Sequence, residues 1–284
     1  MISIGMSTSC VFPLPLEEAF RLARLAGFDG VEIMVTNDKA TQDAATLRAL
    51  SRSYGIPILS IHAPVLLATQ LVWGVSPAVK LERSAALAEA VGATTVIVHP
   101  PFRFQSAYAR IFERTANEVG ERFAVDVAVE NMFTWTIGGR DVRAYAPSPY
   151  PTDLDVRAMT LDFSHAALAG RDSLELALAM GSRLRHVHLC DGLGGTLLDE
   201  HLIPGHGSQP VAEVLGYLSK TRWNGSIVAE VHTHRARTTE GRLAILRETL
   251  DFARTAVARR GAKQSPVPAR VRGRGAPAAP PAAR

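Results

Sequence analysis

Short apolar runs alternate with stretches of helical spacing through residues 1–258 of this 284-residue chain. Several of the runs have consecutive apolar residues rather than an alternating pattern, which is typical of parallel strands covered on both faces. Because parallel strands need long crossover connections, this alternation predicts an α/β fold. The predicted strands are residues 2–7, 30–35, 58–63, 94–100, 125–131, 158–164, 184–190 and 226–232.

Two of the intervening segments carry clear helix signals. Residues 16–27 follow a proline and end in Gly27, and residues 76–92 begin with a serine and a proline and end in Gly92. Eight strand–helix units of this kind predict a single closed (β/α)8 TIM barrel. An open, doubly wound sheet is the alternative, but it usually has a glycine-rich phosphate turn after its first strand. Here that segment reads MSTSCVFPLPLEE and contains no glycine.

The composition changes at residue 259. Residues 259–284 contain seven Lys or Arg, no acidic residue, and many Pro, Ala and Gly without apolar periodicity. We therefore expect a barrel domain over residues 1–258 and a disordered basic tail over residues 259–284. Without the tail the chain has 24 basic and 27 acidic residues, so the net charge of +4 comes from the tail. The predicted barrel is slightly acidic.

The N-terminus and the cysteines bear on the cellular compartment. MISIGMSTSC lacks a basic segment followed by an apolar run, so we expect no secretory signal. No apolar stretch approaches the roughly 18 residues needed to cross a membrane, so no membrane partner is expected. Cys10 and Cys190 form no disulfide framework and are predicted to be packing residues. These features predict a cytoplasmic protein.

Histidines and acidic residues gather at the carboxyl ends of six consecutive predicted strands. In a TIM barrel these ends form the mouth that holds the active site. So many carboxylates and imidazoles would repel or desolvate one another unless a cation organised them. A mixture of nitrogen and oxygen ligands favours Zn²⁺, Mn²⁺, Fe²⁺ or Co²⁺. The sequence therefore predicts a metal site among His62, His99, Glu130, Asp162, His165, His188, Asp199, His201 and Glu230, with Asp199 and His201 in the loop DEHLIPGHG.

Other side chains are expected around this site. Glu32, near the end of the second predicted strand, is expected to face the mouth and to bind a substrate hydroxyl. Trp135 is expected to form an aromatic wall against a sugar face, with packing on a helix as the alternative. His186 should lie one layer deeper than His188, either as its partner or as a core residue. The weaker candidates are His206, His232 and His234.

The chain resembles the xylose isomerase-like TIM barrels, a superfamily of sugar-phosphate isomerases and epimerases that also includes endonuclease IV. The resemblance is carried by GFDGVEI (27–33), VAVEN (127–131), LDFSHAALAG (161–170), HVHLCDG (186–192) and HLIPGHG (201–207). In the isomerases one divalent metal is held by four residues, which match Glu130, Asp162, His188 and Glu230. In endonuclease IV three zinc ions are held by a larger set, which matches all nine residues named above.

This resemblance implies a divalent-metal-dependent isomerase or epimerase of a sugar or sugar phosphate. The expected chemistry is proton abstraction α to a carbonyl through a metal-stabilised enediolate, with Glu130 and Glu230 as the acid–base pair. His62, His99, His165 and His201 would bind substrate hydroxyls or further metal ions. One Mn²⁺, Co²⁺ or Zn²⁺ is expected, with three as the upper number, and the family also implies a homo-oligomer.

Two other functions are open. The first is an endonuclease IV-like, zinc-dependent apurinic/apyrimidinic endonuclease with nucleic acid as its partner. Binding to a duplex needs Lys and Arg, whereas the predicted barrel is slightly acidic, and the loops TNDKATQD and APVLLATQLVWGV do not predict DNA-inserting wedges. The second is a non-catalytic, metal-dependent sugar-binding protein, which would not need a pair of carboxylates. The sequence thus favours a small-molecule sugar substrate.

Overall fold

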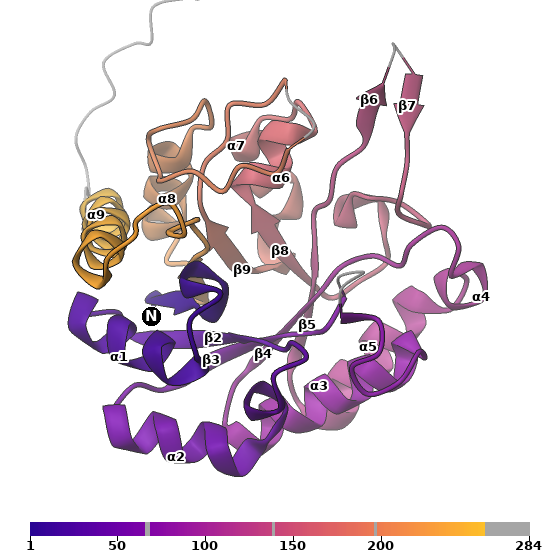
Figure 1. Ribbon diagram of the computed structural model, residues 1–284. Coiled ribbons are helices and arrows are strands. Elements are labelled where there is room, and N and C mark those ends of the chain that lie inside the picture. Colours follow the sequence, from indigo (N-terminus) through magenta and orange to yellow (C-terminus); the bar gives the residue numbers. More distant parts are fainter. Residues whose placement is uncertain (66–68, 138–139, 196–197, 259–284) are drawn as a thin grey trace, which may run out of the picture.

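The computed structural model describes residues 1–65, 69–137, 140–195 and 198–258. Eight parallel strands close into a barrel in the order β1-β10-β9-β8-β5-β4-β3-β2, which confirms the predicted fold class (Figure 1). The predicted tail, residues 259–284, lies outside the described residues, and the division into two segments stays a prediction. The barrel strands are β1 (Ser3–Ser7), β2 (Gly30–Met34), β3 (Ile58–His62), β4 (Thr95–Val98), β5 (Asp126–Glu130), β8 (Ala158–Asp162), β9 (Leu184–Leu189) and β10 (Ser226–Ala229).

Amphipathic helices cover the outside of the barrel. Gly27 and Gly92 follow the first and third of them with φ values of 96° and 78°, the left-handed conformation that favours glycine at a helix end. Short helices occur in the loops after β4 and β8. The helices are α1 (Leu16–Ala26), α2 (Ala44–Tyr54), α3 (Pro77–Val91), α4 (Ser106–Ala109), α5 (Phe112–Phe123), α6 (Phe163–Leu168), α7 (Ser173–Met180), α8 (Val211–Lys220) and α9 (Thr239–Ala258).

The regular alternation of strand and helix fails once, between β5 and β8. The described residues of this connection form an antiparallel hairpin of β6 (Trp135–Ile137) and β7 (Arg140–Val142), followed by a 3-10 helix at Pro151–Asp153. Prolines at positions 147, 149 and 151 lack the N–H that a helix interior requires, which explains the missing helix. The hairpin projects from the carboxyl end of the barrel (Figure 1).

The barrel interior is apolar in its deepest layer and polar above it. Leu59 occupies the space left by two glycines, because a Cβ atom at Gly30 would lie 2.5 Å from Leu59 Cγ and one at Gly5 2.7 Å from Leu59 Cδ1. Two residues beyond Gly30, the buried Glu32 begins the polar layers. In the part of the chain that the structure describes, no helix has the length and apolar character needed to cross a membrane.

Candidate metal centre

Four ligand-type side chains meet at the carboxyl ends of four strands. Glu130 ends β5, Asp162 ends β8, His188 lies in β9 and Glu230 follows β10. One ligand atom of each lies within 4.8 Å of those of the other three. Distances from His188 Nδ1 are 3.1 Å to Glu130 Oε1, 3.7 Å to Asp162 Oδ2 and 3.0 Å to Glu230 Oε2. Three buried carboxylates therefore surround one imidazole nitrogen.

The charges in this cluster depend on one another. Burial disfavours the charged form of His188, but Glu230, Glu130 and Glu32 outweigh it and raise its pKa well above the ordinary value. Burial likewise opposes ionisation of Glu230, yet the nearby histidines, His188 first, lower its pKa to about 2. The pKa of Glu130 is lowered for the same reason. Asp162 differs, because burial raises its pKa. The cluster needs a positive charge at its centre.

A divalent cation fits this requirement. Glu130 Oε2 is buried and makes no hydrogen bond of good geometry among the described residues, although His99 Nε2 lies 3.0 Å away, so this atom is available as a ligand. Ligand atoms of a tetrahedral zinc ion lie about 3.4 Å from one another. This is close to the 3.0–3.7 Å distances between His188 Nδ1 and the three carboxylates. Binding would displace the proton from His188, because a metal-bound imidazole is neutral. One nitrogen and three carboxylate donors suit Mn²⁺, Co²⁺ or Zn²⁺.

Glu32 does not lie where the sequence predicts. Its carboxylate is fully buried, with Oε1 3.2 Å from His188 Nε2 and Oε2 3.0 Å from His186 Nε2, and it accepts a hydrogen bond of 2.8 Å from Ser60. The strand register explains this position, because Glu32 pairs with Ser60 whereas Met34 pairs with His62. Glu32 therefore lies one layer below the mouth, as does the buried His186.

The five other predicted ligands lie beside this centre. His62 Nε2 and His99 Nε2 lie 3.5 Å and 3.0 Å from Glu130 Oε2. Asp199 Oδ2 lies 3.1 Å from His165 Nε2 and 2.8 Å from His201 Nε2. His165, Asp199 and His201 form a second group that could hold a cation. All nine predicted residues are thus brought together at the mouth.

The loop that carries Asp199 and His201 is held by residues that the sequence analysis missed. Asp191 is buried and accepts hydrogen bonds from three backbone N–H groups, those of Gly192, Gly205 and Gln209. Ser164 Oγ donates to Asp199 Oδ1 at 2.5 Å and accepts from the backbone N–H groups of residues 200 and 201. The loop therefore rests on a buried carboxylate and a hydroxyl. In the sequence, the one sign that Asp191 has this role is that it directly follows the HVHLC run.

The weaker histidine candidates lie apart from the centre. His206 is exposed and lies 3.0 Å from Glu248 of α9. His232 and His234 are also exposed. The rings of His232 and His201 have centroids 5.0 Å apart, so His232 approaches the edge of the site. Ser9, which the sequence analysis did not single out, donates a hydrogen bond of 3.1 Å to Glu230 Oε1.

Aromatic rings flank the histidine side of the centre. The centroid of Phe133 lies 5.1 Å from that of His165 and 5.0 Å from that of Trp135. Trp135 is half-buried and packs against a small cluster of Met132, Phe133 and Tyr145. Phe133 begins the FTWTIGG stretch (133–139) that was expected to form the aromatic wall, whereas Tyr145 was not predicted, because an isolated aromatic residue in a loop carries no periodic signal.

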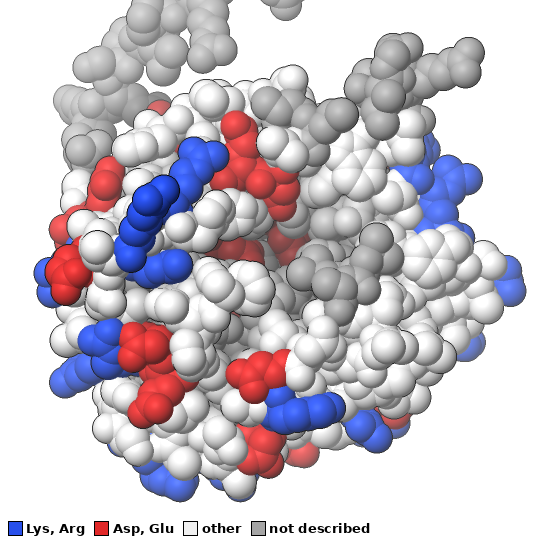
Figure 2. All heavy atoms as spheres, in the orientation of Figure 1, with Lys and Arg blue, Asp and Glu red and all other residues white. Residues whose placement is uncertain are grey.

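The distribution of charged side chains on the surface agrees with the position of the ligand cluster at the mouth. Figure 2 shows acidic side chains deep in the hollow at the mouth, with Lys and Arg mostly around the rim.

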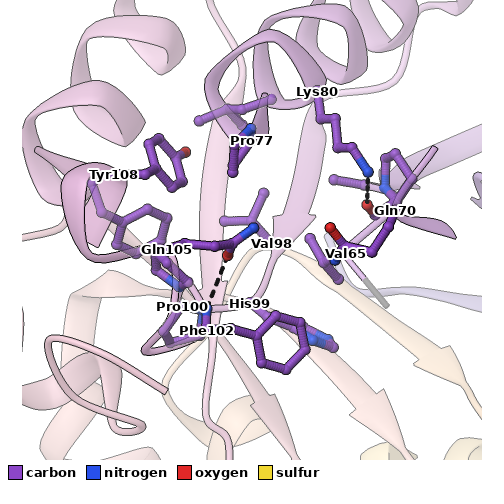
Figure 3. Close-up of a pocket in the computed structure, with 15 residues that line it drawn as sticks. Val65, Gln70, Pro77, Lys80, Val98, His99, Pro100, Phe102, Gln105 and Tyr108 are labelled. Carbon is purple, nitrogen blue, oxygen red and sulfur yellow. Dashed lines mark hydrogen bonds between the residues drawn. The ribbon is translucent and has the colours of Figure 1, made fainter. Parts of the chain in front are cut away.

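A separate cavity of about 40 Å³ lies between α3, α5 and the loops after β3 and β4, and His99 is one of its lining residues (Figure 3). Lys80 of α3 donates to the carbonyl oxygens of Pro64 and Thr69 at 3.4 Å and 2.8 Å, which ties the loop after β3 to this helix.

Fold and site together define a TIM barrel with a candidate metal centre at its mouth. The chain belongs to the xylose isomerase-like TIM barrel family, whose model matches residues 20–256. An uncharacterised protein of Mycobacterium tuberculosis is 45% identical over 273 residues, which cover 89% of this chain and 97% of that protein. The fructoselysine 3-epimerase of Escherichia coli O157:H7 is 24% identical over 257 residues, 81% of this chain and 90% of that enzyme.

Solved structures show the same fold. A xylose isomerase domain protein from Alicyclobacillus acidocaldarius superposes with a TM-score of 0.69 at 20% identity, covering 90% of this chain and 99% of that one. The D-psicose 3-epimerase of Clostridium cellulolyticum H10, solved with D-tagatose, superposes with a TM-score of 0.66 at 14% identity and the same coverage. At these identities the likeness establishes the fold.

Proposed function

We propose that this protein is a divalent-metal-dependent isomerase or epimerase that moves a proton on the carbon beside the carbonyl of a sugar or sugar phosphate. The observation that carries the proposal is the meeting of Glu130 and Glu230 in one four-residue ligand cluster, which supplies two carboxylates to a single reacting centre. Relatives named as fructoselysine 3-epimerase and D-psicose 3-epimerase support a sugar substrate.

Glu130, Asp162, His188 and Glu230 would hold the cation, for which Mn²⁺, Co²⁺ and Zn²⁺ are the candidates. When bound, a divalent cation supplies Lewis acidity to the substrate oxygens, which makes the neighbouring carbon-bound proton more acidic. Buried Glu32 and His186 support His188 from below, so that Nδ1 of His188 faces the three carboxylates.

Glu130 and Glu230 are the groups that we expect to move the proton. Both carboxyls are ionised at neutral pH because the surrounding histidines lower their pKa values, so either one can accept a proton. One carboxylate takes the proton from one face of the carbon, and the other, after taking up a proton from solvent, gives that proton to the opposite face. Glu230 is 8% exposed and Glu130 1%, which makes Glu230 the carboxylate more open to the mouth.

Four histidines around the centre would bind the hydroxyl groups of the substrate. His99 carries a buried Nδ1 atom without a hydrogen-bond partner among the described residues. The Nε2 atom of His99 lies 3.0 Å from Glu130 Oε2. The other three are also each beside a carboxylate, which sets the direction in which they can donate. They are His62, His165 and His201.

Solvent-proton exchange tests the proposal. The protein is incubated with a panel of ketoses and with Mn²⁺ or Co²⁺ in D₂O, and NMR follows deuterium at the carbon beside the carbonyl. We expect incorporation by the wild type, and losses of at least about 100-fold in Glu130→Gln and Glu230→Gln. The exposed Glu89→Gln on α3 should keep the wild-type rate. Full turnover by metal-loaded Glu130→Gln would contradict the acid–base role.

An endonuclease IV-like activity is the second candidate. It is favoured by the group of His165, Asp199 and His201, which could hold a further cation beside the four-residue centre. About three zinc ions per chain and Asp199-dependent cleavage of a duplex with an abasic site would establish it. About one metal per chain and an intact duplex would favour the isomerase. Sugar and metal binding without deuterium incorporation into any ketose would favour a non-catalytic binding protein.

A further inference from the structure

We propose that aromatic side chains beside the metal centre bind a second ring attached to the reacting sugar, so that the preferred substrate is a ring-substituted ketose. This inference rests on the proposed function and adds a substrate class to it. The side chains concerned are Phe102, Phe104 and Tyr145, which we call the aromatic column.

The column is a continuous series of ring contacts. The rings of Phe104 and Phe102 are stacked, with centroids 5.3 Å apart and an interplanar angle of 8°. Phe102 and Tyr145 are also stacked, with centroids 5.3 Å apart and an angle of 23°. Tyr145 meets the ring of His99 edge-on at 6.4 Å, and His99 Nε2 lies 3.0 Å from Glu130 Oε2. The column thus leads from the surface to the predicted reacting centre.

Backbone hydrogen bonds hold the column in place. The loop after β4 and the segment after the β6–β7 hairpin form an antiparallel bridge at Phe102 and Tyr145. Arg103 N donates to the carbonyl of Ala144 at 2.8 Å, and Ala146 N donates to the carbonyl of Pro101 at 2.9 Å. Gln105 Oε1 accepts from Phe102 N at 3.0 Å, a contact drawn in Figure 3. These bonds hold the segments that carry Phe102 and Tyr145 in place before a ligand arrives, which lowers the entropic cost of binding.

The exposed end of the column is the reason to expect a ligand. Tyr145 is 7% exposed and already anchors the hairpin segment, whereas Phe104 is 69% exposed. A ring at that position contributes little to the core, and its stacking on Phe102 presents a flat apolar surface at the outer end of the column. Flat apolar surfaces of this kind stack on aromatic rings or on the C–H face of a pyranose. A second sugar ring and an aryl group could therefore both stack on the exposed face of Phe104.

Four ketoses distinguish these ligands. D-Fructose carries no second ring, isomaltulose carries a glucosyl group on O6, lactulose carries a galactosyl group on O4, and 1-anilino-1-deoxy-D-fructose carries an aryl group on C1. Deuterium exchange with the Mn²⁺-loaded full chain gives kcat and KM for each, and calorimetry gives Kd. We expect at least one ring-bearing ketose to have a kcat/KM about tenfold or more above that of D-fructose. The preferred compound identifies the kind of ring and its attachment point.

Variants of Phe104 test the role of the column. Phe104→Ala should remove the advantage of the ring-bearing ketose, chiefly through a five- to tenfold higher KM (about one aromatic contact), and leave D-fructose unchanged. Phe104→Tyr should retain the advantage. The control is Phe12→Ala, because Phe12 is also 69% exposed but lies outside the column. Since Phe104 is exposed, its truncation should leave the circular dichroism spectrum unchanged.

The two proposals fail in different ways. A ring-bearing ligand that binds through Phe104 without any turnover would support the column and contradict the proposed function. Turnover of D-fructose with no advantage for any ring-bearing ketose would overturn the column alone. An advantage untouched by Phe104→Ala, an equal loss in Phe12→Ala, or no binding of any ring-bearing ketose would also overturn it.

Discussion

Glu32 links the deepest polar layer of the barrel to the candidate metal centre above it. Its carboxylate lies 3.2 Å from His188 Nε2, which leaves His188 Nδ1 for Glu130 and Glu230. A metal-binding histidine commonly donates its other ring N–H to a carboxylate, which fixes both the tautomer and the ring orientation. We therefore infer that Glu32 would act on a bound metal through His188, as a positioning residue.

We predict that Glu32→Ala weakens metal binding about 10- to 100-fold, since His188 loses the partner that orients it. Glu32→Gln keeps an acceptor oxygen for His188 and should show a smaller loss. Calorimetric titration with Mn²⁺ or Zn²⁺ measures the effect, with the exposed Glu89→Ala as a control of the same type. Unchanged metal affinity in a folded Glu32→Ala protein would show that Glu32 does not position the ligand.

Among the elements, the loop after β9 depends on a single buried side chain. Asp191 accepts hydrogen bonds from three backbone N–H groups across residues 192–209, and its backbone forms a bridge with Leu202. Gly207 leaves space for this carboxylate, because a Cβ atom there would lie 2.2 Å from Asp191 Oδ1. This anchoring places Asp199 and His201 at the mouth.

We predict that Asp191→Ala destabilises the protein by about 2–4 kcal/mol, because three backbone donors lose their acceptor. Limited proteolysis should then cut within residues 193–209 at protease concentrations that leave the wild type intact. Asp191→Asn retains one acceptor oxygen, so its stability and its resistance to the protease should lie between those of the wild type and of Asp191→Ala. The exposed Asp43→Ala, which removes a helix cap on α2, is a control for generic destabilisation away from the loop. If Asp43→Ala also made residues 193–209 sensitive to the protease, Asp191 would not be the specific anchor of this loop.

At the scale of the whole molecule, the charge is divided along the chain. The seven Lys and Arg of residues 259–284 make the net charge +4, whereas the preceding residues contain more acids than bases. The last described helix, α9, ends at Ala258, just before this basic segment. The acidic hollow at the mouth (Figure 2) and the basic residues 259–284 therefore come from different parts of the sequence.

We predict that a protein ending at residue 258 melts at the same temperature as the full chain and keeps its ketose activity. Its retention on a heparin column should fall, since the basic residues interact with polyanions. A full-length variant with the seven tail Lys and Arg replaced by Gln separates charge from length. A large drop in melting temperature on truncation would mean that the tail packs against the barrel.

The amino-acid sequence alone predicted the closed barrel, because apolar runs rich in β-branched residues are local signals that recur eight times along the chain. It also identified the nine ligand-type residues at the mouth, since the ends of parallel strands meet at one edge of the barrel. Glu130, Asp162, His188 and Glu230 could be selected as a group only through the family resemblance.

Only the tertiary structure decided the rest. The depth of Glu32 follows from a register shift between β2 and β3, and the hairpin after β5 replaces a helix that the repeating pattern predicts. The aromatic column and the anchoring role of Asp191 join residues from separate loops. Such contacts depend on strand register and loop packing, which are set by the whole chain, so no local stretch of sequence carries them.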